Sequence, residues 1–431
     1  MKVLVVGSGG RDHAIAWKFA RSDRVKRVFV AHGNAGIEET AVCVDARTIE
    51  EMADFACREK VDLTFVGPES PLSSGIVDLF QSRGLEIVGP SQRVSRLESS
   101  KCDAKTILRD LGIPVPEFEN FSDPDKARDY VRGTGYPVVV KADGLAAGKG
   151  SLVCDDVAGA EEAIHEIMEK RVFGDSGARV DIERRLYGRE LSFFCFTDGY
   201  GVLPMVAAQD YKRALDGDEG KNTGGMGSYS PHPWLDDELV ATVMKDVAEP
   251  LVRGVREKHG MLYKGVLYLG LMLVEEKGGI TPYVLEINIR LGDPEAQVIL
   301  PRLETDLVDI CEAIQEERLG EMRARWDERY RLCLICVSGR TKGKKGWYKG
   351  YPDRYKIGAP IEGLDRVEDS CLVFHSGTGR GEDGRLVTTG GRVLGIVSSG
   401  DTLAQARQVA YEQMEKVSFD GMYYRGDIGI D

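Results

Sequence analysis

The chain has 431 residues, of which 42% are hydrophobic and 29% are charged, and it carries a formal net charge of −13. Its length corresponds to roughly two to four domains, its composition excludes a disordered chain, and its acidic balance argues against a general nucleic-acid-binding protein. No apolar run approaches the roughly 20 residues of a membrane helix, so we expect no membrane association.

Short apolar runs alternate with segments of helical periodicity over residues 1–100. We expect strands at Lys2–Val6, Arg27–Ala31, Leu63–Gly67 and Leu85–Gly89. The first run passes directly into glycines, which predicts a strand and not a signal peptide. The alternation predicts an N-terminal α/β domain with a doubly wound parallel sheet, whose ligands bind beyond the carboxyl ends of the strands. Three unusual loops lie at those ends, at Gly7–His13, His32–Gly36 and Gly67–Leu72.

The first of these loops, GSGGRDH, partly matches a dinucleotide-binding fingerprint. Gly7 and Gly9 fit the pattern, but Asp12 stands where the third glycine belongs. A phosphate at the N-terminus of the following helix is one alternative, and a tight strand-to-helix turn is another. In the third loop, Glu69 lies between two prolines and either accepts hydrogen bonds from sugar hydroxyls or is a solvated turn residue.

A second domain is expected to start near Ser100, and its most distinctive stretch is KADGLAAGKG at Lys141–Gly150. Apolar runs on both sides of this stretch predict strands. Glycines can turn backbone N–H groups toward an anion, and lysines add point charge for phosphates. The stretch therefore predicts a cover over a nucleoside triphosphate, with a plain glycine-rich hairpin as the alternative. It is not a P-loop, because a strand and not a helix follows it.

The segments around that cover predict a small lid over residues 121–190, with the order β–α–β–β–α–β. The polar, glycine-rich stretch Gln209–Pro231 predicts a long loop, which in a compact enzyme is either functional or disordered. Its charged residues are Asp210, Lys212 and Arg213, and its Asn222–Gly227 segment (NTGGMG) is a possible anion-binding nest. A long helix is expected over residues 236–260.

A second candidate constellation lies in an expected strand over Thr281–Gln297. Glu286 and Asn288 are two residues apart and therefore share one face of that strand, and Arg290 continues the face. Hard oxygen ligands suit Mg²⁺, and a guanidinium nearby would stabilise a transferring phosphoryl group. The alternative is that these three residues form an ordinary solvent-exposed strand face. The Gly-Asp-Pro turn that follows favours the functional interpretation.

A last, small β-rich α+β domain is expected from about residue 326 onward. Its strands are predicted at LCLICVSG, CLVFHSG and GRVLGIVSSG, and its helix at TLAQARQVAYEQMEKV. The chain has nine cysteines, an odd number scattered along it, which indicates reduced thiols in a cytoplasmic protein. Cys333 and Cys336 form a CxxC, but without a second pair or a helix start they are interpreted as buried strand residues.

These motifs together resemble those of the glycinamide ribonucleotide synthetases, which are members of the ATP-grasp superfamily. The resemblance covers nearly the whole chain and rests on KADGLAAGKG, NTGGMG and RLGDPE combined with the N-terminal GSGGR. It implies a substrate-binding domain at 1–100, an ATP-grasp domain at 101–325 with a lid at about 121–190, and a C-terminal domain at 326–431. It also implies ligation of glycine to 5-phosphoribosylamine through glycyl phosphate, with ATP and Mg²⁺ or Mn²⁺. We expect a monomer with small-molecule partners only.

The resemblance implies a role for each matching residue. ATP would be bound by Lys101, Lys141, Gly148, Lys149, Glu183, Leu186 and Glu190. The metal would be held by Glu286 and Asn288, and catalysis would depend on Arg290, Lys141 and Asp293. The substrates would be bound by Gly9, Arg11, Asn34, Gly36, Gly67, Glu69, Asp210, Lys212 and Arg213.

The chain departs from the family pattern at the hinge, where Arg184 and Arg185 stand in place of an acid and an aromatic residue. The strand around Gly270 also lacks the second carboxylate with which many ATP-grasp enzymes hold metal. Two other functions stay open at this point: an ATP-grasp enzyme that uses bicarbonate or formate, and a nucleotide-binding protein without turnover. A nicotinamide enzyme is disfavoured by Asp12.

Overall fold

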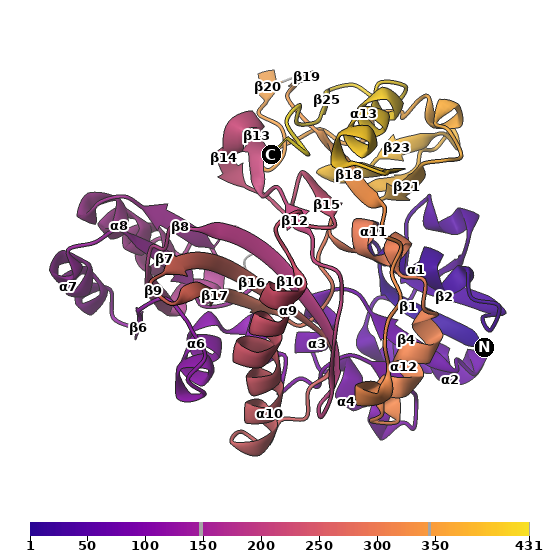
Figure 1. The fold of residues 1–431 in the computed structure, drawn as a ribbon. Coiled ribbons are helices and arrows are strands. Elements are labelled where there is room, and N and C mark those ends of the chain that lie inside the picture. Colours follow the sequence, from indigo (N-terminus) through magenta and orange to yellow (C-terminus); the bar gives the residue numbers. More distant parts are fainter. Residues whose placement is uncertain (146–149, 344–345, 431) are drawn as a thin grey trace.

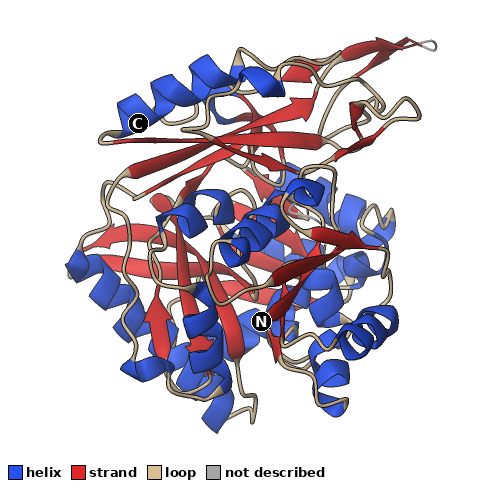
Figure 2. Ribbon diagram, turned by 90° about the vertical axis from the view of Figure 1, so that its right-hand side faces the viewer, coloured by secondary structure: helices blue, strands red, loops and turns tan. Residues whose placement is uncertain are grey.

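The computed structural model describes residues 1–145, 150–343 and 346–430. Figure 1 shows an N-terminal sheet domain on one side, a lid projecting on the opposite side, and a C-terminal domain above both. In the side view of Figure 2, the long strands of the C-terminal domain cross above the other sheets. None of the described helices combines the length and apolarity that crossing a membrane requires.

The N-terminal domain is built on a five-stranded parallel sheet of order β3-β2-β1-β4-β5, which confirms the predicted doubly wound sheet. Its strands are β1 (Lys2–Gly7), β2 (Arg27–His32), β3 (Val42–Val44), β4 (Leu63–Val66) and β5 (Ile87–Val88). Its helices are α1 (Gly10–Ala20), α2 (Ile49–Glu59), α3 (Glu69–Ser73) and α4 (Ile76–Ser82). The strand order reverses beside β1, which places the loops after β1 and β4 at the ligand-binding crevice.

The lid has the predicted order β–α–β–β–α–β, folded as a four-stranded sheet of order β6-β9-β7-β8. It packs around a hydrophobic cluster of its own, which includes Val140, Ile164 and Ile182. Its elements are β6 (Phe118–Phe121), α7 (Pro124–Thr134), β7 (Val138–Ala142), β8 (Ser151–Cys154), α8 (Val157–Ile164), which continues as a π-turn (His165–Glu169), and β9 (Val180–Arg184).

The centre of the molecule is an antiparallel sheet of order β11-β10-β16-β17. Its strands are β10 (Arg189–Asp198), β11 (Val202–Pro204), β16 (Lys264–Glu276) and β17 (Gly279–Asn288). The helices are α5 (Arg96–Ser99), α6 (Lys101–Asp110) and α9 (Asp237–Val243), which runs through a π-turn (Met244–Ala248) into α10 (Glu249–Glu257). The strand expected to reach Gln297 ends at Asn288 instead. Helix α11 (Ala296–Ile299) follows.

The prediction of one long loop over Gln209–Pro231 is wrong. The stretch forms four short strands, and its strands β12 and β15 extend the C-terminal sheet. These strands are β12 (Gln209–Asp210), β13 (Arg213–Leu215), β14 (Glu219–Asn222) and β15 (Gly227–Ser230). The pairing of Gly227 with Leu334 joins segments more than a hundred residues apart, and no local pattern reveals such a partner.

The C-terminal domain contains the predicted strands and helix, and Cys333 and Cys336 are buried in β18 as expected. Its sheet has the order β12-β15-β18-β24-β21, with β25 also paired to β18. Its elements are β18 (Tyr330–Ser338), β19 (Thr341–Gly343), β20 (Gly346–Tyr348), β21 (Leu372–His375), β22 (Thr378–Arg380), β23 (Leu386–Thr388), β24 (Arg392–Gly400), α13 (Leu403–Met414) and β25 (Met422–Tyr423). Helix α12 (Leu307–Gln315) returns to the N-terminal domain, where Asp309 pairs with Arg24.

Candidate active site

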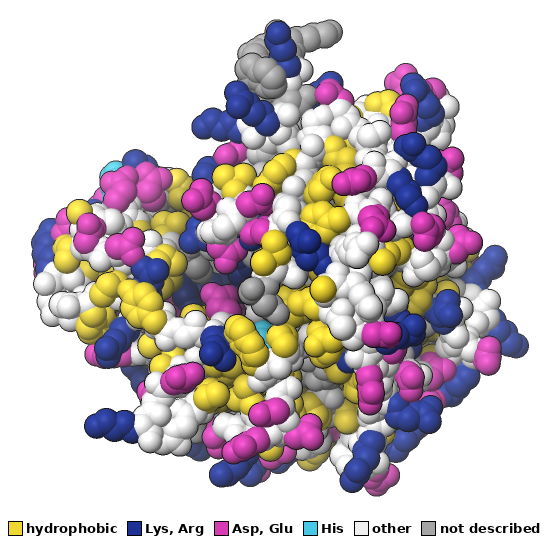
Figure 3. Space-filling view, turned by 45° about the horizontal axis from the view of Figure 1, so that its top comes forward, with side chains coloured by type: hydrophobic (Ala, Val, Ile, Leu, Met, Phe, Trp, Pro, Cys, Tyr) yellow, Lys and Arg dark blue, Asp and Glu magenta, His cyan; other side chains and the backbone are white. Residues whose placement is uncertain are grey.

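The candidate site lies where the lid, the end of β17 and the N-terminal loops approach one another. Figure 3 shows a recess between the lid and the rest of the molecule, with acidic and basic side chains inside it. The hinge Arg184–Arg189 joins β9 of the lid to β10 of the central sheet, and these two strands belong to different sheets. The recess therefore has one wall from the lid and another from the central sheet.

Two lysines and one carboxylate form the lid side of the site. Lys141 Nζ of β7 lies 2.5 Å from Glu183 Oε1 and donates to the Leu285 carbonyl oxygen at 3.0 Å. Lys105 Nζ of α6 lies 3.2 Å from the same Glu183 oxygen and donates to the Val284 carbonyl oxygen at 2.7 Å. An ammonium group has three hydrogens, so each lysine keeps at least one N–H beyond these two contacts. Sequence reasoning missed Lys105.

The charges of these groups are set by their mutual contacts. Desolvation alone would raise the pKa of Glu183, but Lys105 and Lys141 outweigh it and lower that pKa to about 2. Desolvation lowers the pKa of Lys105 to about 8, whereas for Lys141 the charge of Glu183 outweighs desolvation and raises the pKa. Lys141 is therefore a fixed positive charge.

Glu286 and Asn288 lie two residues apart on β17, as predicted, and face the recess from the opposite wall. Glu286 pairs with Gly270 of β16, where a Cβ would lie only 2.8 Å from Glu286 Cγ, so the glycine leaves room for the carboxylate. Desolvation would raise the pKa of Glu286, but Lys212 and Lys101 outweigh it and lower the pKa to about 2. The carboxylate is therefore ionised at neutral pH.

This donor set fits a hard divalent cation that is also bound by phosphates. An ionised carboxylate and a side-chain amide supply oxygen ligands of the kind that Mg²⁺ and Mn²⁺ prefer. Asn288 is buried, and its Oδ1, the atom that could bind a metal, also accepts a hydrogen bond from Arg290 Nη2 at 3.1 Å. Among the described residues, no three His, Cys, Asp or Glu side chains converge as metal ligands.

Arg290 lies just beyond the end of β17 and is held by three side chains and by the Leu291 carbonyl oxygen. Its guanidinium contacts Glu98 Oε1 at 2.9 Å, Asn288 Oδ1 at 3.1 Å and Glu69 Oε2 at 3.3 Å. Desolvation opposes the charge, but Glu98 and Glu69 outweigh it and raise the pKa of Arg290. Glu98 also accepts a hydrogen bond from the Ile289 N–H at 2.8 Å. Sequence reasoning missed Glu98, although its position close before Lys101 in the LESSK motif was a usable signal.

Charged residues of the stretch Gln209–Pro231, which was predicted to be a loop, reach the same recess. Lys212 Nζ lies 3.7 Å from both Glu190 Oε2 and Glu286 Oε1. Desolvation raises the pKa of Asp210 to about 8, with Lys212 opposing that rise. Arg213 instead donates to the Gly220 carbonyl oxygen within the β13–β14 ribbon. The structure therefore brings Asp210, Lys212 and Glu190 to Glu286, but not Arg213.

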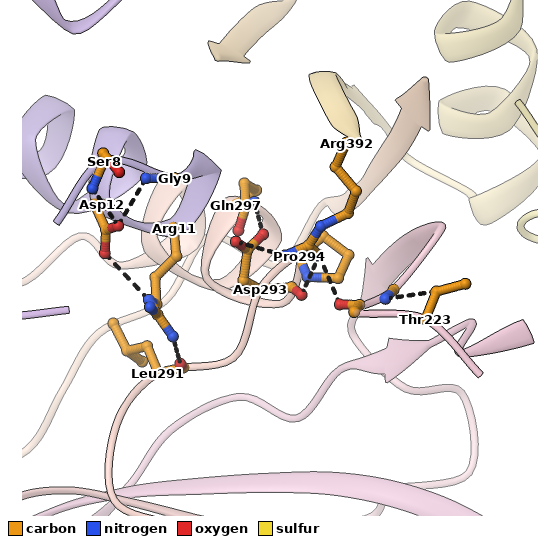
Figure 4. A network of polar contacts seen from close by, with 12 residues as sticks. Ser8, Gly9, Arg11, Asp12, Thr223, Leu291, Asp293, Pro294, Gln297 and Arg392 are labelled. Carbon is orange, nitrogen blue, oxygen red and sulfur yellow. Dashed lines mark hydrogen bonds and ion pairs between the residues drawn. The ribbon is translucent and has the colours of Figure 1, made fainter. Parts of the chain in front are cut away.

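The side chain of Asp12 accepts hydrogen bonds from the backbone of the loop after β1, as Figure 4 shows. Asp12 Oδ2 accepts the N–H groups of Ser8 and Gly9, both at 2.8 Å, and Asp12 Oδ1 accepts from Arg11 Nε at 3.1 Å. A Cβ at Gly67 would lie 1.9 Å from Asp12 Oδ1, so the loop after β4 also requires a glycine. Asp12 occupies the donors that a dinucleotide-binding loop would offer to a pyrophosphate.

Asn34 and Gly36 connect the N-terminal domain to the C-terminal domain. Asn34 Nδ2 donates to the carbonyl oxygens of Ser8 and His375, both at 2.8 Å, and its Oδ1 accepts from the Gly36 and Ile37 N–H groups. A Cβ at Gly36 would lie 2.2 Å from the His375 ring. Both residues thus fix this loop beside the C-terminal domain.

The hinge places its two unusual arginines away from the recess. The Arg184 N–H donates to the Glu117 carbonyl oxygen, its guanidinium lies over the Tyr136 ring, and Arg185 pairs with Asp155 of the lid. Leu186, by contrast, makes no backbone hydrogen bond within the described ranges, so its backbone is free for the edge of a base. Gly148 and Lys149 lie outside the described residues.

Asp293 is held between two domains (Figure 4). Arg392, the first residue of β24, lies 2.9 Å from Asp293 Oδ2 and also donates to the Gly224 carbonyl oxygen at 2.6 Å. Gln297 Nε2 donates to Asp293 Oδ1 at 2.7 Å. Arg392, which sequence reasoning missed, therefore joins the Gly-Asp-Pro turn and the NTGG segment to the C-terminal sheet.

Replacing Arg392 by alanine is expected to lower the free energy of unfolding by about 3 kcal/mol, because Asp293 would lose the cation of a largely buried pair. Urea denaturation of the purified variant measures this change. The matched control is Arg385→Ala in the same domain, whose ion pair with Asp383 is solvent-exposed and should leave the denaturation midpoint almost unchanged. Equal midpoints for the two variants would contradict the bridging role.

Comparisons with known proteins agree with this geometry. Models of phosphoribosylglycinamide synthetase match the chain with their N domain at residues 1–98, their ATP-grasp (A) domain at 99–296 and their C domain at 348–431. The phosphoribosylamine–glycine ligase of Caldanaerobacter subterraneus subsp. tengcongensis is 47% identical over 430 residues, which cover 99% of this chain and 99% of that protein.

Solved structures agree as well. The crystal structure of the Thermotoga maritima phosphoribosylamine–glycine ligase has a TM-score of 0.83 and 32% identity, and the match covers 99% of this chain and 100% of that one. A biotin carboxylase from Campylobacter jejuni, at 14% identity and a TM-score of 0.69 over 98% of this chain and 92% of that one, shares the fold. The expected three-part ATP-grasp architecture is thereby confirmed. The chain belongs to the phosphoribosylglycinamide synthetase family, the phosphoribosylamine–glycine ligases of the ATP-grasp superfamily.

Proposed function

We propose that the chain ligates glycine to 5-phosphoribosylamine with ATP, giving glycinamide ribonucleotide, ADP and phosphate in the de novo synthesis of purines. Membership of the ligase family supports this activity. The observation in the structure that carries it is the approach of the lid to β17. Lys141 Nζ lies 3.0 Å from the carbonyl oxygen of Leu285, the residue before Glu286. An ammonium group and a carboxylate so placed can act on one triphosphate from two sides.

The reaction needs activation because a carboxylate is a poor electrophile. In the proposed first step, a carboxylate oxygen of glycine attacks the γ-phosphorus of ATP, the bond to the β–γ bridging oxygen breaks, and ADP leaves. In the second step the amine of 5-phosphoribosylamine attacks the acyl carbon of glycyl phosphate, and phosphate leaves with the former carboxylate oxygen. The protein contributes positioning and charge neutralisation, and no covalent enzyme intermediate is needed.

The residues divide between the two walls of the recess. We propose that Lys101 and Lys141 bind the phosphates of ATP, with Glu183 orienting Lys141, and that Leu186 and Glu190 contact the base and the ribose. The guanidinium of Arg290 neutralises the phosphoryl group in transfer, because three side chains hold it in place. The metal pair would be Glu286 and Asn288, and a bound Mg²⁺ or Mn²⁺ would supply charge for the phosphate oxygens.

The remaining sites are assigned by their position. We propose that the loops after β1 and β4, which contain Gly9, Arg11, Gly67 and Glu69, bind 5-phosphoribosylamine, and that Asn34 and Gly36 hold the loop beside them. Asp210, Lys212 and Asp293 would complete the cleft between this region and ATP. We keep the domain limits at residues 100 and 325, with the lid at about 121–190, and propose a cytoplasmic monomer.

Glycine labelled with oxygen-18 in its carboxylate tests the proposed function. With ATP, Mg²⁺ and 5-phosphoribosylamine present, labelled oxygen should appear in inorganic phosphate, because the carboxylate oxygen leaves with it. Omitting either glycine or the sugar amine should stop ADP formation, and formate or bicarbonate should not replace glycine. Unlabelled phosphate, or turnover that continues with formate or bicarbonate in place of glycine, would contradict the proposal.

A further inference from the structure

An aspartate lies directly beside the ATP lysine in the lid sheet. Asp181 of β9 pairs with Lys141 of β7 on one side and with Asn120 of β6 on the other. Residues directly opposite in antiparallel strands project from the same face. Glu183, two residues further along β9, shares that face as well. Asp181 is therefore one of a row of polar side chains that ends at Lys141, and its exposed fraction is 0%.

The Asp181 carboxyl group receives no hydrogen bond. Within the part of the chain that the structure describes, neither of its oxygens has a hydrogen-bond donor, and the buried Oδ1 of Asn120 lacks one too. The two cations that face it, Lys105 and Lys141, are both committed to Glu183 Oε1 and to carbonyl oxygens of β17. The sulfhydryl of Cys102 on α6 also lies close enough to Asp181 for the two groups to interact electrostatically.

A buried carboxylate without donors is costly, whereas a neutral carboxylic acid gains an O–H that both neighbours can accept. Desolvation and then the charge of Glu183 raise the pKa of Asp181 well above its usual value, against the opposing effect of the two lysines. The neutral acid can donate to the Glu183 carboxylate or to Asn120 Oδ1. The protonation of Asp181 also sets the net charge of the cluster. The two lysines carry more positive charge than the Glu183 carboxylate balances, and an ionised Asp181 would cancel that excess.

We propose that Asp181 is a positioning residue that, as a neutral hydrogen-bond donor to Glu183, keeps the positive charge and the third N–H of Lys141 available for the phosphates of ATP. This inference rests on the proposed function only in taking Lys141 as a ligand of ATP. No motif pointed to Asp181, since the stretch VDIERR is an ordinary strand until its neighbours are known. The residue acts through Lys141 and Glu183 and does not itself contact the substrates.

The test compares Asp181→Asn, which keeps a neutral donor of the same shape, with Asp181→Leu, which keeps the branching at Cγ and removes the donor. Calorimetric titration with the nonhydrolysable analogue AMP-PNP and Mg²⁺ gives the affinity. We expect Asp181→Asn to bind within about twofold of the wild type and Asp181→Leu to bind at least about tenfold more weakly, the effect of losing a hydrogen bond to a charged group. In steady-state kinetics the loss should appear in the KM for ATP more than in kcat.

The pH dependence adds a readout that a purely structural residue would not change. As pH rises, ionisation of Asp181 in the wild type should weaken AMP-PNP binding, because a second carboxylate then competes for Lys141. Lys105, whose pKa is lowered to about 8, loses its charge in both proteins, so Asp181→Asn should show the smaller decline. An Asp181→Asn variant as weak as Asp181→Leu, an Asp181→Leu variant equal to the wild type, or the same pH dependence in wild type and Asp181→Asn would each overturn the proposal. If Asp181→Leu does not fold, the pH comparison between the wild type and Asp181→Asn still tests the proposal.

The two proposals can fail separately. Nucleotide affinity is measured without glycine or the sugar amine, so the Asp181 comparison stands even if the oxygen-18 experiment rejects the ligase activity. Conversely, labelled phosphate from the wild type together with identical affinities for all three proteins would reject only the role of Asp181.

Discussion

Replacing Glu286 by glutamine is expected to lower kcat/KM at least about a hundredfold, the usual range for loss of a charged group that acts on a phosphoryl transfer. Glutamine keeps the shape of the side chain, which fits against Gly270, but removes the negative charge that Lys212 and Lys101 stabilise. The carboxylate is the stronger of the two proposed metal ligands, so the midpoint of activation by Mg²⁺ should also move to higher concentration. ADP formation at several Mg²⁺ concentrations measures both effects.

The matched control for this variant is Glu275→Gln. Glu275 is an exposed glutamate on β16, the strand paired with β17, and its replacement removes the same charge outside the recess. We expect its activity and Mg²⁺ dependence to match the wild type. If Glu286→Gln retained nearly normal activity at low Mg²⁺ concentration, the metal site would have to lie elsewhere.

Replacing Arg290 by lysine is expected to reduce kcat about a hundredfold or more, although the positive charge is kept. The guanidinium contacts Glu98, Asn288 and Glu69 at once. An ammonium group has no planar fork, and a shorter side chain cannot meet all three acceptors. Glu98 is buried, so part of its charge would be left without a partner, and Asn288, a proposed metal ligand, would lose its orientation.

Steady-state kinetics with saturating ATP measure this effect, and circular dichroism checks that the variant is folded. Arg184→Lys is the control, because Arg184 is an exposed hinge arginine whose guanidinium lies over Tyr136 and not in the recess. Its kcat should stay within about twofold of the wild type. An Arg290→Lys enzyme as active as the control would show that a point charge is sufficient at this position.

The sequence predicts those parts of the fold that depend on local periodicity. The parallel sheet and the lid follow from apolar runs that alternate with helical segments, and Glu286 and Asn288 follow from the two-residue period of a strand. Strand β3 was missed because it has only three residues, of which the first is exposed and the other two are half-buried. The strands within 209–230 were missed because β15 finds its partner, β18, far along the chain. Pairing between segments so far apart cannot be predicted from the local sequence pattern.

The same limit applies to the site. Lys105, Glu98 and Asp181 are ordinary helix and strand residues in the sequence, and their importance comes from burial and from partners on other elements. Glu98 meets the backbone of Ile289 across 191 positions, and Arg392 reaches Asp293 from a different domain. Arg213 is the opposite case, because the sequence assigned it to the site and the structure does not. It lies next to a motif, but its side chain points toward its own hairpin. Motifs locate a site, whereas only the fold shows which side chains complete it.

A crystal structure with AMP-PNP and Mn²⁺ tests most directly the idea that two walls act on one nucleotide, because the anomalous scattering of manganese locates the metal without ambiguity. We predict that manganese lies between the Glu286 carboxylate and the phosphates, and that Lys141 Nζ contacts the same triphosphate from the lid side. A nucleotide bound away from Lys141, or manganese held by residues other than Glu286 and Asn288, would contradict the account.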